Sequence, residues 1–167
     1  GAGASAVNRV GSQTQAFIAN STGTGIDVDG GITVDASDTS SIDSTVFAVS
    51  ISASFGMFGG SVAVGVSTAT NEIASTVGAQ IDRSLVKAAG DITVRATDDA
   101  SIDSESTAIA FALSISIGVS FAGGGANAFN TIRTGTFAAI DRSTADKVPG
   151  SDTGLSVVTT GKTITVL

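Results

Sequence analysis

The chain lacks several residue types on which enzyme sites and disulfide-stabilised scaffolds depend. Its 167 residues include no cysteine, histidine, tryptophan or tyrosine, and a single proline. Without cysteine, these residues form neither a disulfide framework nor a thiolate metal site. Without histidine, they lack the side chain that most readily acts as a general base near neutral pH. We therefore expect no enzymatic activity and no cofactor, apart from the calcium hypothesis considered below.

Positive charge is also scarce. The chain has 8 Lys and Arg residues against 15 Asp and Glu residues, which gives a formal net charge of −7. Nucleic-acid binding requires a basic surface, so we expect no nucleic-acid partner. Serine and glycine interrupt every apolar run before it reaches the ~18 residues of a membrane helix. The sequence therefore leads us to expect no membrane partner.

Small and β-branched residues are abundant in the chain. In several segments, small residues alternate with large apolar ones. In residues 109–121, each odd position is large and apolar and each even position is Ala, Ser or Gly; residues 47–55 are similar. This period of two predicts long β-strands. Glycine-rich segments at 56–60 and 123–125 predict turns into return strands, and so long β-hairpins. We expect the large side chains to fill a core and the small face to allow close approach of another sheet.

The same pattern occurs nearly three times. Asn8, Asn71 and Asn130 are equivalent positions with spacings of 63 and 59 residues, and an Ile-Thr-Val segment recurs at 32–34, 92–94 and 164–166. We expect one repeat array with repeats at about 1–59, 60–122 and 123–167. Variable loops are expected at 22–29, 85–89 and 144–161. Self-similarity of this length predicts structural units stacked on one another.

Parallel stacking would place the three asparagines above one another, where they can bond from repeat to repeat. The plainer interpretation is a preference of asparagine for turns or strand edges, and both interpretations stay open. The chain starts within one repeat and stops within a strand, so Gly1 and Leu167 are expected assembly edges. The expected partners are further repeats of the same chain or identical protomers arranged end to end.

The best copy of the repeat, at 90–143, carries a family resemblance. It contains Gly-Asp-Ile-Thr-Val-x-Ala, an alternating strand, Ala-Gly-Gly-Gly-Ala-x-Ala-x-Asn-x-Ile and Ala-x-Ile-x-x-Ser. These blocks resemble the repeats of giant bacterial surface proteins, the filamentous hemagglutinins and leukotoxin-like adhesins. The resemblance implies an elongated all-β solenoid, an extracellular or cell-surface location, and adhesion, with host or cell-surface glycans among the partners.

Acidic residues gather around the Ile-Thr-Val segments. Calcium takes six to eight oxygen ligands, which neighbouring repeats are able to pool. The hypothesised weak calcium ligands are Asp35, Asp38, Asp43, Asp98, Asp99 and Asp103. The plainer interpretation is a solvated acidic face that blocks edge pairing.

A second charged pattern is the Asp-Arg pair at 82–83, which recurs at 141–142. One interpretation is a surface recognition row. The other is a row of alternating charge that contributes little to stability.

The predicted function is that of a stiff structural or adhesive segment of a secreted bacterial surface protein or extracellular filament, without catalysis. One alternative is a membrane-inserting pore or barrel, because the segments 46–68 and 107–130 accommodate transmembrane strands of about 9–11 residues. A further alternative is a polysaccharide-binding or polysaccharide-cleaving β-helix that uses a carboxylate pair such as Asp98 and Asp99.

Overall fold

The fold consists of strands and connecting segments. The computed structural model describes residues 1–56, 58–115, 118–141, 157–160 and 162–167, with only the backbone described for 157–160. The strands in these ranges are β1 (Ala2–Ala19), β2 (Ile26–Val28), β3 (Ile32–Asp38), β4 (Ser41–Phe55), β5 (Ser61–Asp82), β6 (Leu85–Ala88), β7 (Ile92–Asp98), β8 (Ser101–Ile115), β9 (Ser120–Asp141), β10 (Val157–Thr160) and β11 (Ile164–Val166). Nowhere in the described part is there a helix long and apolar enough to cross a membrane.

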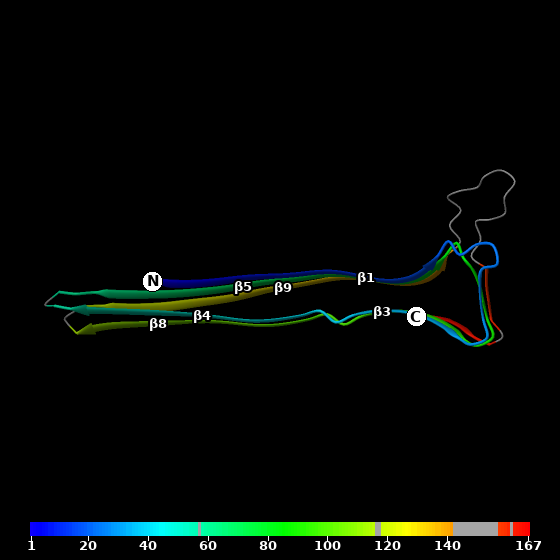
Figure 1. The fold of residues 1–167 in the computed structure, drawn as a ribbon. Coiled ribbons are helices and arrows are strands. Elements are labelled where there is room, and N and C mark those ends of the chain that lie inside the picture. Colours follow the sequence, from blue (N-terminus) through cyan, green and yellow to red (C-terminus); the bar gives the residue numbers. More distant parts are fainter. Residues whose placement is uncertain (57, 116–117, 142–156, 161) are drawn as a thin grey trace. The chain divides into compact units, whose positions relative to one another are not determined.

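Each sheet collects the equivalent strands of successive repeats (Figure 1). The strand orders are β1-β5-β9, β2-β6-β10, β3-β7-β11 and β4-β8. The pairs β2–β6, β3–β7 and β4–β8 are parallel, and residues 60 apart face each other in all three; Ile32, for example, faces Ile92. The all-β class and the parallel pairing predicted from the repeats are therefore confirmed.

The two long strands of a repeat do not pair with each other, so the predicted long β-hairpin is wrong. β4 pairs with β8, whereas β5 lies between β1 and β9. The turn that contains Gly56, with φ of 145°, thus carries the chain from one sheet into another. Pairing with the next repeat places like residues opposite each other, such as Ser54 and Ser114. A hairpin would pair two different strand sequences, and a shift of one residue would reverse their faces.

The predicted variable loops each contain a short strand, which is a second correction. β2, β6 and β10 form their own parallel sheet, while 144–156 and 161 lie outside the described residues. In β6, Val86 and Ala88 are buried while Leu85 and Lys87 are exposed. A period of two cannot be recognised over three or four residues, which is why the sequence pattern did not reveal these strands.

The chain divides into two compact units. Unit 1 comprises Gly1–Val10, Ser41–Ala74 and Ser101–Arg133, and unit 2 comprises Gly11–Ser40, Ser75–Ala100 and Thr134–Leu167. The long strands β1, β5 and β9 each contribute residues to both units. The two units differ in what they bury.

Unit 2 has a conventional apolar core. Its buried residues are Val34, Ala36, Val77, Ala79, Ile81, Val86, Ala88, Ile92 and Val94, which come from β3, β5, β6 and β7. Seven of these nine belong to β5, β6 and β7, the middle strands of their sheets. The equivalent residues of the outer strands, such as Ile18 and Ile140, are only partly buried. Burial in this unit is therefore completed by a repeat on each side.

Unit 1 reverses the polarity expected of it. Its two layers, the first part of β1-β5-β9 and the sheet β4-β8, face each other through small side chains such as Ala48, Ser50 and Ala63, all buried. The large apolar residues that we expected in a core lie on the outside. The reason is the close approach of the layers: a Cβ added at Gly65 would lie 2.9 Å from the backbone oxygen of Ile109. No large side chain fits between the sheets beside Gly65, whereas Ile42, Val46 and Ile73, further along the same layers, are buried.

Candidate functional site

A ladder of three asparagines crosses the sheet β1-β5-β9 within unit 1. Asn8 Nδ2 donates to Asn71 Oδ1 at 2.9 Å, and Asn71 Nδ2 donates to Asn130 Oδ1 at 2.9 Å. Asn71 also donates to the hydroxyl of Ser104 on the opposite layer, and Asn8 donates to Ser44. The side chain of Asn71 is almost fully buried, so its amide is satisfied by protein rather than by water. The ladder joins repeats laterally and joins the two layers.

Serine hydroxyls hold two of the hypothesised calcium ligands in unit 2. Asp38 accepts hydrogen bonds from Ser12 Oγ at 2.6 Å and from Ser40 Oγ at 2.9 Å. These bonds, of which that from Ser12 has the larger effect, lower the pKa of Asp38 below its ordinary value because they favour the ionised form. One repeat later, Asp98 accepts a bond of 2.5 Å from Ser75 Oγ. The two carboxylates tie sheets together in successive repeats.

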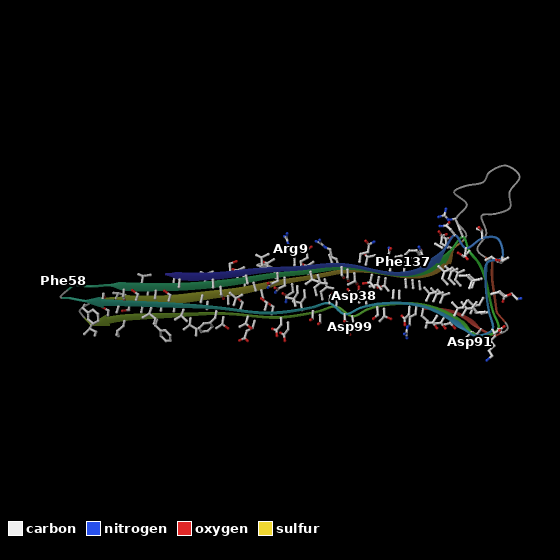
Figure 2. The ribbon with its side chains drawn as sticks, viewed as in Figure 1. Arg9, Asp38, Phe58, Asp91, Asp99 and Phe137 are labelled. Atoms are coloured by element: carbon white, nitrogen blue, oxygen red, sulfur yellow. The ribbon has the colours of Figure 1, made fainter. Side chains whose placement is uncertain are left out.

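The other hypothesised calcium ligands are distributed along the sheets. Asp35 is paired with Arg95, whose hydrogen bond lowers the pKa of that carboxyl. Asp43 faces Asp103 across β4–β8 in unit 1. Asp99, marked with Asp38 in Figure 2, donates its backbone N–H to the Asp38 carbonyl at 2.9 Å. Within the described ranges, no three acidic side chains gather closely enough to hold a metal ion.

Ion pairs between repeats follow the outer surface of both units. In unit 1, Glu72 lies between Arg9 at 3.4 Å and Arg133 at 2.9 Å. In unit 2, Lys87 pairs with Asp27 at 3.3 Å, in addition to the pair Asp35–Arg95. Each pair joins a basic residue of one repeat to an acidic residue of its neighbour, so a shift in register would separate them.

The Asp-Arg dipeptides behave differently. Arg83 forms an ion pair of 3.2 Å with its own neighbour Asp82, within one repeat. Arg142 lies outside the described residues. The structure therefore describes the hypothesised row of alternating charge at 82–83, and the dipeptide at 141–142 lies partly outside the described residues.

The predicted assembly edges lie at the ends of the outer strands β1 and β11, each beside a middle strand. The backbone N–H of Leu167 donates to the Val94 carbonyl at 3.0 Å, so the residue extends the pairing of β11 with β7. Gly1 lies against β5, because a Cβ added to it would lie 3.4 Å from the Val64 oxygen. Beside the edge strand β1, unit 1 has an open groove of about 470 Å³ lined by Val7, Asn8, Arg9, Val10, Ser41, Ile42 and Asp43. The groove exposes the space between the two layers.

Several of these contacts were not predicted, although the sequence contains a partial signal for them. The partners Ser12 and Ser75 are equivalent positions 63 residues apart, and their acceptors Asp38 and Asp98 are 60 apart. The alignment of repeats identifies such pairs as equivalent. The alignment does not predict which strands lie opposite each other in space. That arrangement is what places each serine beside its aspartate.

No family model, curated protein or solved structure matches this chain.

Proposed function

We propose that the chain is a segment of a β-solenoid with a structural role, in which each repeat adds one strand to every sheet. The observation that carries this proposal is the register. Like residues of successive repeats face each other over whole strands, for example Ile42 and Ile102, or Ala48 and Ala108. When successive strands have the same residue pattern, the last strand offers the same pairing edge to a further repeat. Strands can therefore be added to the sheet without a change of sequence pattern.

The gradient of burial supports continuation beyond the strands at each edge. Ile81 in the middle strand β5 is fully buried, whereas Ile18 in β1 and Ile140 in β9 are partly exposed at equivalent positions. Another repeat on either side would cover these side chains and gain about 25 cal/mol for each Å² of apolar surface removed from water. We propose that this neighbour is a further repeat of the same chain or a second copy of it.

The contacts between repeats also support a stack with a fixed register. The asparagine ladder ends on the edge strands β1 and β9, and the groove beside β1 opens between the layers of unit 1. Ion pairs such as Glu72 with Arg133 add a preference for one alignment. Exposed ion pairs of this kind specify register more than they add stability.

The biological setting forms the second part of the proposal. We propose that the segment belongs to an extracellular bacterial surface protein or filament with an adhesive role. This part rests on the resemblance of residues 90–143 to the repeats of filamentous adhesins. Calcium remains a hypothesis for the six aspartates named above, and a melting temperature that does not change on addition of a chelator would contradict it.

The stacking proposal is tested by adding one repeat. Ser61 bonds to Ser120, 59 residues away, at 3.2 Å. A tandem copy of residues 64–122 inserted after Ala122 therefore preserves the register of this sheet. The lengthened chain should fold, show the same far-UV circular dichroism per residue, and melt at a higher temperature, because stability in stacked repeats grows with each added interface.

The matched control is a copy of residues 65–122 inserted at the same place. It is one residue shorter, so the strand after the junction presents its opposite face to the layer beneath it. This control should melt below the in-register chain by several degrees. Equal melting temperatures for the two insertions, or failure of the in-register chain to fold, would contradict the stacking proposal.

A further inference from the structure

Two long segments of unit 1 carry no charge at all. No Lys, Arg, Asp or Glu occurs between Asp43 and Glu72 or between Glu105 and Arg133. These segments comprise most of β4 and β8, the turn after β4, and the first halves of β5 and β9. They are called the uncharged arm below.

The outside of the uncharged arm is apolar on both layers. On the sheet β4-β8, large side chains such as Ile51, Phe55 and Phe111 are more than half exposed. On the other layer, the exposed residues include Val62, Phe121 and Phe129. Phe58 in the turn, labelled in Figure 2, is 88% exposed. Soluble monomers rarely expose contiguous apolar surface on this scale.

The buried side chains between the two layers of the arm include several serines. Ser67 and Ser106 share a hydrogen bond of 2.8 Å between the layers, and Ser61 bonds to Ser120 at 3.2 Å. In a water-soluble protein, packed sheets bury apolar residues and expose polar ones, and the arm has the reverse arrangement. Apolar residues on the outside are found where strands contact lipid. We propose that the uncharged arm inserts into the hydrocarbon region of a lipid bilayer.

The distribution of the apolar residues favours lipid over a second copy of the chain. They cover two opposite faces and the turn that joins them, whereas a copy packed on one face would leave the other face and Phe58 in water. A fluid hydrocarbon phase contacts all three surfaces. The stretch from Phe47 to Phe55 is nine residues, or about 30 Å at about 3.3 Å per residue, comparable with the hydrocarbon thickness of a bilayer.

The backbone sets a condition on insertion. Among the described residues, β4 and β8 form a two-stranded sheet, in which each has one edge without a strand partner. Open edges are not tolerated in hydrocarbon, because their N–H and C=O groups would lose their hydrogen bonds with water. Stacking closes these edges, so the inference rests on the proposed function: the inserting species is a stack of repeats. It also departs from the expectation, drawn from the sequence, of no membrane partner.

A single tryptophan tests the inference, because the chain contains none. Phe111 in the arm and Phe17 in unit 2 are 60% and 61% exposed, which makes Phe111→Trp and Phe17→Trp a matched pair. Each variant is mixed with phosphatidylcholine vesicles with and without brominated acyl chains, and assembly is followed in the same samples by sedimentation. Zwitterionic lipid avoids repulsion of a chain with net charge −7.

The expected result is a blue shift and severalfold stronger quenching by brominated chains for Phe111→Trp than for Phe17→Trp. Adding Phe55→Lys at the exposed end of β4 should abolish this quenching, whereas Gln15→Lys on the exposed face of unit 2 should not. Persistence of the quenching in the Phe55→Lys variant would overturn the inference.

Three further outcomes separate the two proposals. Assembled chains without selective quenching would overturn insertion and leave stacking intact. A blue shift that grows with protein concentration, without vesicles and without quenching, would mean that a second copy covers the arm, and would also overturn insertion. Selective quenching in chains that sediment as monomers would support insertion of the arm and contradict the condition that copies of the chain must stack before they insert.

Discussion

Replacement of Asn71 by alanine tests whether the asparagine ladder holds the repeats together. The Asn71 side chain is 1% exposed and makes three hydrogen bonds, with Asn8, Ser104 and Asn130, each of 2.9 Å. The alanine variant removes all three and leaves the amide of Asn8 and the hydroxyl of Ser104 facing a small cavity.

The size of the effect follows from these contacts. A buried hydrogen bond contributes about 0.5–1.5 kcal/mol net, so the loss of three predicts a decrease of about 3 kcal/mol in the free energy of unfolding. Asn130→Ala, on the edge strand β9, removes only one of the three hydrogen bonds and should lower the free energy of unfolding by about 1 kcal/mol. Asn127→Ala, at another exposed asparagine of β9, is the control and should change stability by less than about 0.5 kcal/mol.

Urea denaturation followed by far-UV circular dichroism measures all three variants against the parent chain. The predicted order of destabilisation is Asn71→Ala, then Asn130→Ala, then Asn127→Ala. If Asn71→Ala lay within about 0.5 kcal/mol of the parent, the ladder would make no net contribution and the reasoning would be refuted.

Three other substitutions probe separate contacts. A Cβ at Gly78 would lie 2.2 Å from the ring of Phe137, so Gly78→Ala should lower the melting temperature. Phe137→Ala in the same chain should restore part of the loss, and no restoration would refute this contact. The hydrogen bond from Ser12 lowers the pKa of Asp38, so its stabilisation is present above about pH 4 and is lost as pH falls through the depressed pKa. Ser12→Ala should therefore destabilise the chain at pH 7 by more than at acid pH, and a difference that does not shrink as the pH is lowered would contradict that assignment. Glu72→Gln should lower the free energy of unfolding by about 0–1 kcal/mol at low salt, because it removes the ion pairs with Arg9 and Arg133. The difference should vanish in 1 M NaCl, where exposed charges are screened.

The register of the stack was predictable because equivalent residues recur in the sequence. Asn8, Asn71 and Asn130 align by inspection, and the alignment of the Ile-Thr-Val segments pairs Asp35 with Arg95. Parallel pairing follows from such repetition, since each strand finds its own pattern in the next repeat. The short strands β2 and β6 were missed because three or four residues carry too little periodicity.

The inside and outside of unit 1 were not predictable from alternation alone. A period of two assigns Ser50 and Ile51 to opposite faces but does not say which face is buried. The separation of the two sheets decides this, and Gly65 and Gly124 lie too close to the opposite backbone for a Cβ at either position. The expectation that the larger side chains are buried holds for unit 2 and fails for the alternating residues of the uncharged arm, such as Ile51 and Phe111.

Thiol labelling measures directly which face of β4 is buried in unit 1. The chain has no cysteine, so Ser50→Cys and Ile51→Cys each provide a single thiol at adjacent positions of β4. Ser50 is 3% exposed and Ile51 is 75% exposed. The account predicts rapid maleimide labelling of Ile51→Cys and strong protection of Ser50→Cys in the folded chain, with equal rates in urea. Rapid labelling of Ser50→Cys together with protection of Ile51→Cys would contradict it.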